Sequence, residues 1–250
     1  MKYTNNRKRV MEKLGGTRKM SIKDKYIVRE ISKKDAQDII VKEHYLHRKA
    51  PCSYCYGLVD KATNEILGVV MYGVPASRAL QVGVCGKDNA HLVGELTRLW
   101  IHDSVPKNGE SFLIGNSIKL QGFKILVSYA ECRANHVGYV YQATNWLYTG
   151  LSAKRNDYLV DGVENGKHGR HLLDSYGGIK KAREILGDRL VTVARPRKHR
   201  YVYFNCSKKE RKQLLKQLKY KIEAYPKGDV VKPIEIPIVA QDNIQLEWSL

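Results

Sequence analysis

The segment Val127–Gly150, VSYAECRANHVGYVYQATNWLYTG, decides how the middle of this chain folds. It opens as an apolar run that ends at the carboxylate of Glu131, and it continues with one His, three Tyr, one Trp and two Gly. A short apolar run bounded by polar residues is typical of a buried strand. We therefore expect a strand over 124–131 and a helix over 136–147, whose polar groups either belong to a packed core or form the wall of a reaction site.

Helices and strands are expected on both sides of this segment. Ser32 has the position of an N-cap, with Asp35 in the first turn of the helix that follows. The polar turn DKATNE joins two apolar runs and indicates a hairpin over 55–74, and Lys107-Asn108-Gly109 turns the chain into another helix. The other expected elements are strands over 26–32, 93–103, 156–162 and 198–205, and helices over 177–187 and 207–222.

This order of elements predicts an α/β or α+β fold with a central, mostly antiparallel, twisted sheet flanked by helices. It is also the order of the GNAT acyltransferase fold, in which the turn before a helix binds a pyrophosphate through backbone N–H groups. The equivalent turn here, VPKNGES, lacks the glycine-rich, arginine-led signature that is usual for acetyl-coenzyme A binding. Ser111 and Ser117, on the helix after this turn, are predicted substrate-binding residues.

The charge of the chain is concentrated at two places. Its 250 residues have a formal net charge of +19; residues 1–25 hold nine Lys and Arg against two acids, and residues 195–221 hold eleven against one. We predict a basic N-terminal arm over 1–25, a catalytic domain over 26–205, and a basic helix with an extended tail over 206–250. Concentrated positive charge favours a nucleic-acid backbone as partner over a solvated surface or a membrane.

Several classes of protein are excluded or disfavoured by composition. Apolar runs are much shorter than the roughly 20 residues that span a membrane, and the basic N-terminus has no apolar region behind it, so no signal peptide is predicted. Five Cys is an odd number, which favours reduced thiols. We expect a cytosolic protein with no membrane partner; the sequence does not specify whether it is a homodimer.

The stretch KEHYLHR places His44 and Tyr45 where a predicted helix opens toward a loop, with His47 and Arg48 beyond. His can transfer protons or bind a metal near neutral pH, and Tyr can donate a proton. A cationic His at a helix C-terminus is equally favourable without any catalytic role. Residue types alone leave these two interpretations open.

Two cysteines follow the same stretch. His44 and His47 with Cys52 and Cys55 give the spacing H-x2-H-x4-C-x2-C, whose residue types match zinc ligands. Zinc sites usually combine two well-separated pairs, whereas these pairs are close together. Packed thiols are therefore favoured over a zinc site.

Strand alternation over 93–103 puts Glu95, Thr97 and Leu99 on one face and Leu96, Arg98 and Trp100 on the other. Arg98 either holds an anionic substrate group or pairs with an acid on the surface.

Glu131 ends its predicted strand, a usual position for an active-site carboxylate in α/β folds. In the predicted helix that follows, Tyr141 and Asn145 are four residues apart and share a face. Aromatic residues near a basic surface are suited to a base taken out of its stack. A core helix that uses Tyr for bulk is the alternative, and Trp146 and Leu147 are expected in the core.

Several motifs together resemble the Mom family of phage DNA-modification proteins. They are EHYLHR, ILGVVMYGVPAS, ELTRLWIHDSVPKNGESFLIG, SYAE followed by HVGYVYQATNWLYTG, and KHRYVYF. They occur in the family's order within residues 26–205, and neither basic arm takes part in the resemblance.

The resemblance implies a GNAT-like fold and the conversion of adenine in DNA to N6-methylcarbamoyl adenine, which protects phage DNA from host restriction. It points to His44, Tyr45, Glu131 and Tyr141 as functional residues, and to iron held by the first three; the family usually has Asp where this chain has Glu131. A His, a Tyr and a carboxylate that converge would suit such a metal.

Three functions follow from these observations. The first is an enzyme that modifies adenine in double-stranded DNA, in which Arg98 and Asn145 bind the substrate and Lys208, Lys209 and Arg211 contact phosphates. It would use a small donor, acetyl-coenzyme A or another. The second is a conventional acetyl-coenzyme A acyltransferase that acts on a protein or small molecule, and the third is a non-catalytic DNA-binding protein.

Overall fold

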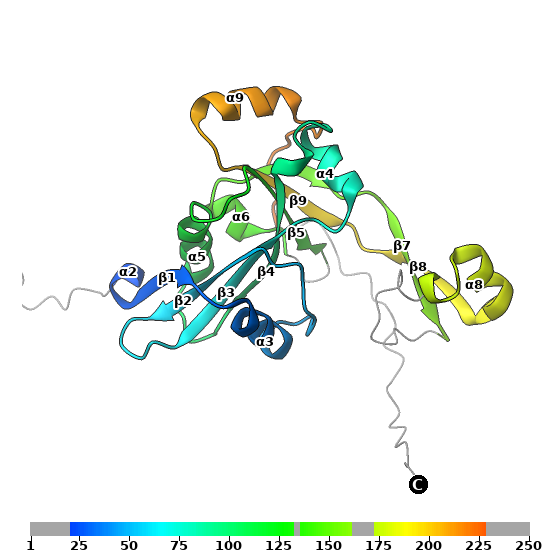
Figure 1. The fold of residues 1–250 in the computed structure, drawn as a ribbon, viewed down its shortest axis with the longest axis horizontal. Helices are drawn as coiled ribbons and strands as arrows, with labels where there is room; N and C mark the ends of the chain where they lie inside the picture. The colour runs from blue at the N-terminus through cyan, green and yellow to red at the C-terminus, as the bar shows by residue number, and fades with distance from the viewer. Residues whose placement is uncertain (1–20, 133–135, 162–172, 229–250) are drawn as a thin grey trace, which may run out of the picture. The chain divides into compact units, whose positions relative to one another are not determined.

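The structure is a computed structural model, and it describes residues 21–132, 136–161 and 173–228 (Figure 1). Most of the expected elements are present. The helices and strands are α2 Ile22–Lys25, β1 Tyr26–Glu30, α3 Lys33–Glu43, β2 Tyr54–Asp60, β3 Ile66–Gly73, α4 Arg78–Cys85, β4 Val93–Ile101, α5 Gly109–Ser117, β5 Ile125–Glu131, α6 Tyr139–Ala143, β6 Leu147–Leu151, β7 Arg155–Val160, α8 Ile179–Leu186, β8 Leu190–Arg195, β9 Lys198–Phe204 and α9 Lys208–Gln217, with short 3-10 turns η1 Ala90–Leu92 and η3 Gly187–Arg189. The strand over 26–32, the helix capped by Ser32 and the hairpin are confirmed, and the Ser32 hydroxyl accepts the Asp35 N–H at 3.0 Å.

The main sheet has seven strands in the order β1-β2-β3-β4-β5-β9-β6, beside a separate two-stranded sheet of β7 and β8. Strands β1 to β4 pair antiparallel, each with the next along the chain, and β4 pairs parallel with β5. The β4–β5 register covers Val93–Glu95 with Ile125–Val127, although β4 continues to Ile101. The predicted mixed α/β architecture with a mostly antiparallel sheet is confirmed.

The chain divides into two compact units, each of which is described by itself. The first contains residues 1–128, 140–147 and 201–221, and the second contains 129–139, 148–200 and 222–250.

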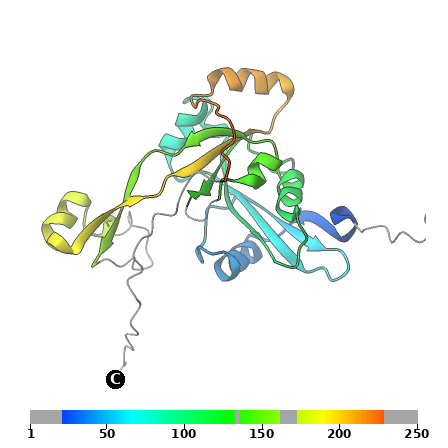
Figure 2. The same ribbon diagram turned by 180° about the vertical axis from the view of Figure 1, so that it is seen from behind.

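In the first unit, helices cover both faces of the sheet, and the strand alternation of β3 explains why (Figure 2). Met71 packs with Ala36 and Ile40 of α3 in one buried cluster. The neighbouring Tyr72 points the other way, and its hydroxyl lies 2.8 Å from that of Ser117 on α5. Because successive side chains of a strand alternate between faces, α3 and α5 lie on opposite faces of β3.

A bulge in β4 overturns the expected alternation there. Tyr72 pairs with Leu96 and Met71 pairs with Arg98, so Thr97 is an extra residue that has no partner position in β3. A bulge shifts every later side chain to the other face. Leu96 therefore shares the α5 face with Tyr72, whereas Glu95 and Arg98 share the α3 face, where the simple alternation placed them apart.

The helix expected over 136–147 is much shorter. It spans Tyr139–Ala143, and Asn145 then has a left-handed backbone with φ of 61°, which Asn tolerates better than most residues. The N–H of Trp146 donates to the Tyr141 carbonyl at 2.9 Å, and the chain continues into β6 at Leu147. Tyr141 and Asn145 therefore do not share a helical face, although the predicted core position of Trp146 is confirmed by its complete burial.

The sequence did not lead us to expect α4 or β8. Helix α4 is short and contains Val and Gly, which are poor helix formers, and its start is fixed by Ser77, whose hydroxyl accepts the Leu80 N–H. Strand β8 is stabilised by its antiparallel pairing with β7. Helix α9 ends at Gln217, short of the expected 222, and the expected extended tail lies largely outside the described residues. Within the described ranges, no helix is long and apolar enough to cross a membrane.

Candidate functional site

His44 is fixed at the point where α3 ends. It is the C-cap of the helix, its N–H donates to the Ile40 carbonyl at 3.1 Å, and its side chain is only 7% exposed. Burial lowers the pKa of His44 to about 4, and the positive charges of Arg98 and His47 lower it further in the same direction. His44 is therefore neutral at physiological pH, so its position at the helix end is not that of a cationic cap.

The hydrogen bond to the His44 ring selects its tautomer. The Leu46 N–H donates to Nδ1 at 3.1 Å, so the neutral imidazole carries its proton on Nε2. The ring thus offers Nε2–H as a hydrogen-bond donor. Tyr45 lies on this ring, with centroids 4.3 Å apart and planes inclined by 26°, and its own side chain is 67% exposed.

Arg98 reaches the same place from β4. Its guanidinium donates to the carbonyl oxygens of Thr97 at 2.7 Å and Arg48 at 3.5 Å. Its Nε is buried and has no hydrogen-bond partner among the described residues. Burial lowers the pKa of Arg98, an effect that Tyr45 and Glu95 partly oppose. Arg98 is thus not an exposed surface residue, and it retains a donor for a further acceptor.

The sequence pattern did not indicate Glu95 as a site residue. Glu95 interacts electrostatically with both Arg98 and Tyr141. The bulge at Thr97 places it on the face of Arg98. Simple alternation along β4 would put Glu95 and Arg98 on opposite faces of the sheet. The bulge at Thr97 is visible only in the pairing of β3 with β4, so the sequence does not identify the Glu95 carboxylate. We call His44, Tyr45, Glu95 and Arg98 the α3–β4 cluster.

Tyr141 is less accessible than its predicted role requires. It is 7% exposed, its ring packs against Trp146 and Tyr201, and its hydroxyl accepts a hydrogen bond from Ser128 at 2.7 Å. Burial raises the pKa of Tyr141 to about 12, and Tyr45 and Glu95 raise it as well. Because its ring contacts Trp146 and Tyr201 in the core, Tyr141 offers little surface for stacking a base.

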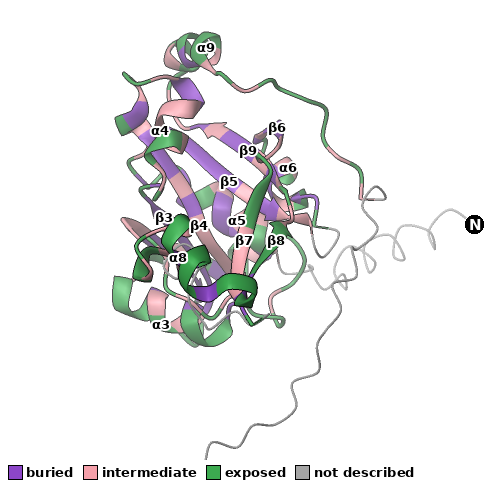
Figure 3. Cartoon of the chain, turned by 90° about the vertical axis from the view of Figure 1, so that its right-hand side faces the viewer, coloured by how far each residue is buried: buried purple, intermediate pink, exposed green. Residues whose placement is uncertain are grey.

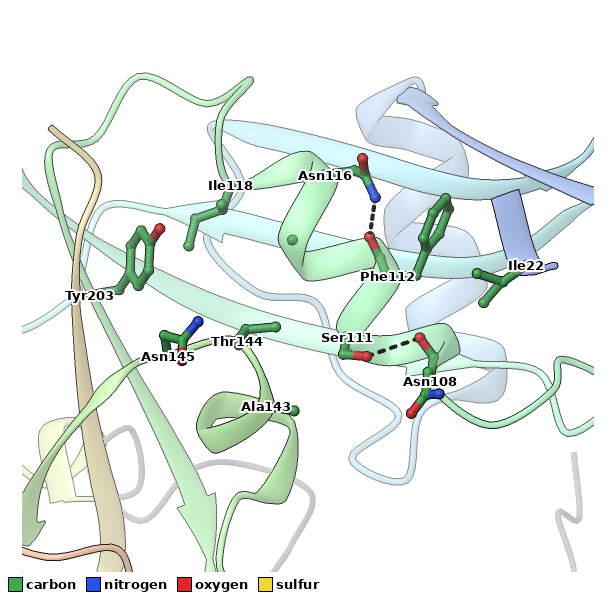
Figure 4. Close-up of a pocket in the computed structure, with 11 residues that line it drawn as sticks. Ile22, Asn108, Ser111, Phe112, Asn116, Ile118, Ala143, Thr144, Asn145 and Tyr203 are labelled. Carbon is green, nitrogen blue, oxygen red and sulfur yellow. Dashed lines mark hydrogen bonds between the residues drawn. The ribbon is translucent and has the colours of Figure 1, made fainter. Parts of the chain in front are cut away.

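A pocket of ≈ 560 Å³ lies beside α5 in the same unit (Figure 4). Of the predicted substrate-binding residues, Ser111 and Asn145 line it. Ser117 does not, because it is fully buried and bonded to Tyr72. The lining residues are Ile22, Asn108, Ser111, Phe112, Gly115, Asn116, Ile118, Ala143, Thr144, Asn145 and Tyr203.

The chemistry of this pocket is polar but uncharged. Its lining carries amides, hydroxyls and the rings of Phe112 and Tyr203, and it includes no Lys, Arg, Asp or Glu. The Ser111 hydroxyl donates to the Asn108 carbonyl at 3.1 Å, and the Asn116 amide donates to the Phe112 carbonyl at 2.7 Å. Such a lining fits a neutral, hydrogen-bonding, partly aromatic ligand better than a bare phosphate.

Glu131 belongs to the second unit, where its carboxylate lies 3.8 Å from the Lys198 ammonium. It therefore has a cationic partner of its own. His44 and Tyr45 belong to the first unit, and the Nδ1 lone pair of His44 is occupied by the Leu46 N–H. As arranged, the three predicted iron ligands do not form one ligand cluster within either unit.

Across residues 21–132, 136–161 and 173–228, no group of three or more His, Cys, Asp or Glu side chains could hold a metal ion. Cys52 and Cys55 are free thiols; the Cys52 thiol donates to the Tyr54 carbonyl at 3.6 Å, and the Cys55 thiol donates to the Ile31 carbonyl at 3.2 Å. The preference for packed thiols over a zinc site stays a prediction, and so does iron.

The predicted phosphate-binding residues lie on α9. Ser207 and Glu210 form a capping box at its start, and Glu210 also accepts from the Lys124 ammonium at 2.6 Å. The buried Leu214 anchors the opposite side of the helix, and its carbonyl accepts from the Cys85 thiol at 3.7 Å. The exposed cations on α9 are Lys208, Lys209, Arg211, Lys212 and Lys216.

Solved structures that are similar to this chain include spermidine/spermine N-acetyltransferase SpeG of Vibrio cholerae, with a TM-score of 0.41 and 9% identity over 76% of this chain and 99% of that one. Arabidopsis thaliana NAA60 has a TM-score of 0.43 and 12% identity over 72% of this chain and 97% of that one.

The similarity in sequence is to another group of proteins. Methylcarbamoylase mom of Escherichia phage Mu is 29% identical over 198 residues, which cover 77% of this chain and 80% of that protein. The model of the Mom protein family matches residues 25–227, a range that contains the α3–β4 cluster and every lining residue of the α5 pocket except Ile22. The chain therefore belongs to the Mom protein family.

Proposed function

We propose that this protein is a phage DNA-modification enzyme that converts adenine in DNA to N6-methylcarbamoyl adenine and so protects phage DNA from restriction in the host cell. The observation that carries the proposal is the family match over residues 25–227, together with a relative named for methylcarbamoylation. The geometry of the first unit supports an enzyme that transfers a carbonyl-containing group to a neutral amine.

The α3–β4 cluster has the groups that such a transfer needs. Negative charge develops on the carbonyl oxygen as the amine attacks, and preorganised donors in a partly buried site stabilise it. The Nε2–H of neutral His44 and the guanidinium of Arg98, whose Nε lacks a partner among the described residues, are such donors. A neutral imidazole that polarises a carbonyl is an established catalytic arrangement.

As the new bond forms from the amine to the carbonyl carbon, the bond to the donor's leaving group breaks and that group departs with the electron pair, while a proton must leave the amine. Glu95 is a carboxylate on the same face as Arg98, and we assign it the role of proton acceptor. Tyr141, buried behind the cluster, helps to set the electrostatic environment of Tyr45 and Glu95. Tyr45 has the most exposed side chain of the cluster and is the one placed to contact substrate.

The pocket beside α5 is the proposed place for a neutral ligand, the donor or the adenine. Its size is in the range of ligand sites, and its amides can bond to the edge of a purine or to a neutral donor of the methylcarbamoyl group. The cations of α9 would contact DNA phosphates and make binding dependent on salt. No step of the proposed reaction uses iron.

Mass spectrometry of nucleosides from plasmid DNA, after expression in bacteria, tests the proposal. Wild-type protein should give a modified deoxyadenosine with the mass of the methylcarbamoyl product, and Arg98→Met should reduce it strongly. Digestion of the same plasmid with a restriction enzyme should fail in proportion to the modification. If deoxyadenosine stays unmodified in cells that contain folded wild-type protein, the proposal is overturned. Metal analysis of protein purified anaerobically tests whether the protein binds iron.

A further inference from the structure

The second unit contains a β-ribbon whose role is not explained by the site described above. Strands β7 and β8 pair antiparallel from Arg155 with Arg195 to Val160 with Leu190, in continuous register. They form a sheet separate from the seven-stranded one. An isolated two-stranded sheet is only marginally stable in water, so its persistence requires a partner on at least one face.

Helix α8 packs on one face of this ribbon, at the end where Val160 pairs with Leu190. Val160 and Leu190, which are directly opposite each other, form a buried cluster with Ala182 and Leu186 of α8. Residues that oppose each other across antiparallel strands point to the same face, and the next pair points to the other. The outer face, away from α8, therefore carries Arg155, Asp157, Leu159, Val191, Val193 and Arg195.

This outer face is apolar at one end and cationic at the other. Val191 and Val193 are 39% and 37% exposed, so two neighbouring apolar side chains on this face are in contact with water. Figure 3 shows the exposed positions along the ribbon. Arg155 is exposed, and Arg195 lies 3.4 Å from Asp157.

The cationic end continues beyond the ribbon. Residues 154–157 and 195–200 together contain six Lys and Arg against one acid. Arg197 donates to the backbone carbonyls of Ser152 at 2.6 Å and Leu151 at 3.2 Å, which fix its guanidinium without neutralising its charge. The fixed cations can contact the charged groups of a polyanion, and the apolar strip beside them can contact its apolar interior.

We propose that the outer face of the β7–β8 ribbon binds in the major groove of duplex DNA, with Arg155 and Arg197 on phosphates and Val191 and Val193 on base edges. This inference rests on the proposed function for the choice of DNA as partner. The major groove is about 12 Å wide and admits a two-stranded β-ribbon, and it presents thymine methyl groups to apolar side chains. The uncovered valines and the flanking cations are both accounted for by this single partner.

Fluorescence anisotropy with a short labelled duplex tests the proposal in the full-length protein. Val193→Glu places a carboxylate on the outer face and should raise Kd by about tenfold or more, because it faces phosphates and apolar base edges. The matched control is Ile185→Glu, which adds the same charge to α8 at a residue that is 65% exposed and not on the outer face of the ribbon. Its Kd should stay within about twofold of wild type.

Two further measurements identify the groove and the cations. Methyl green, which occupies the major groove, should displace wild-type protein, and netropsin, which occupies the minor groove, should not. Arg155→Gln with Arg197→Gln should reduce the slope of log K against log salt by about 1.8, the value for two lost phosphate contacts. These two exposed side chains test the proposal even if Val193→Glu fails to fold, which circular dichroism would reveal.

The outcomes separate this inference from the proposed function. Unchanged binding by both Val193→Glu and the double Arg variant, while wild type still modifies adenine, would overturn the ribbon inference alone. So would displacement by netropsin. A wild-type dimer in sedimentation that Val193→Glu dissociates without changing DNA binding would assign the face to a second copy instead. If wild type neither binds duplex DNA nor modifies it, the proposed function itself fails.

Discussion

The α3–β4 cluster and helix α9 use positive charge in opposite ways. In the cluster, Arg98 is withdrawn from water, its pKa is lowered by burial, and its Nε has no partner in the described parts of the chain. On α9 the cations are exposed, and the helix beneath them is fixed by Glu210 and Leu214. A buried, preorganised charge stabilises a reacting group strongly at one point, whereas exposed charges act together through counterion release.

The largest effect should come from removing the buried charge. Arg98→Met keeps the length of the side chain and loses its donors, and we expect the rate of adenine modification to fall about 100- to 1,000-fold, the usual result of losing one such donor. Quantitative mass spectrometry of nucleosides measures it. Arg29→Met, at an exposed arginine bonded to Asn64, is the control. A loss below threefold for Arg98→Met would show that this guanidinium does not act on the reacting group.

Removing the exposed charges should affect binding and leave the chemical step intact. With Lys208, Lys209, Arg211 and Lys212 changed to Gln, the slope of log K against log salt should fall by about 3.6 if each contacts one phosphate. The matched control neutralises Lys33, Lys34, Lys42 and Lys49, four exposed lysines on or near α3. Equal flattening by both sets would mean that net charge, and not the α9 surface, governs binding.

The uncharged pocket offers a third test. Asn116→Leu removes an amide from its lining, and the loss of one hydrogen bond should raise the apparent KM about tenfold with little change in kcat. The pair of constants should be measured for both the donor and the DNA, because this identifies which of them occupies the pocket. Lys119→Leu, just beyond α5, is the control; a fall in kcat alone for Asn116→Leu would argue against a binding role.

The smallest effect should be on stability. Hydrogen bonds from Lys124 and Ser207 hold the pKa of Glu210 at about 2, below its ordinary value of 4.5. Since the pKa is lower in the folded state, the stabilisation is fully present above pH 4.5 and is lost as pH falls toward 2. Urea midpoints of wild type should exceed those of Glu210→Gln at pH 6, and the two should converge near pH 2.5. A difference that is constant with pH would contradict this.

Much of the fold could be predicted from the sequence. The hairpin, the Ser32 cap and the strands around it depend on local patterns of apolar residues and on short-range hydrogen bonds, which the sequence displays directly. The failures have tertiary causes. The helix over 136–147 stops early because Trp146 is drawn into the core and Asn145 adopts a left-handed turn, and β8 forms because β7 is there to pair with it.

The residues of the candidate site also divide into those that the sequence could indicate and those that only the tertiary structure reveals. His44, Tyr45 and Arg98 could be found from the sequence, as could Ser111 and Asn145, which line the pocket. Glu95 could not, because its face depends on the bulge at Thr97, and the burial of Ser117 and Tyr141 depends on which side of a helix the core covers. The functional roles of all these residues stay predictions for the experiments above.

The sequence by itself determined the family, the mixed sheet and the concentration of positive charge near the C-terminus, because these follow from residue types and their local order. Only the tertiary structure decided how those charges are used. Burial makes His44 a neutral donor and Arg98 a fixed cation, whereas α9 and the β7–β8 ribbon keep their cations in water. The reason is physical: the same side chain changes its pKa and its partners with the surroundings that distant residues create.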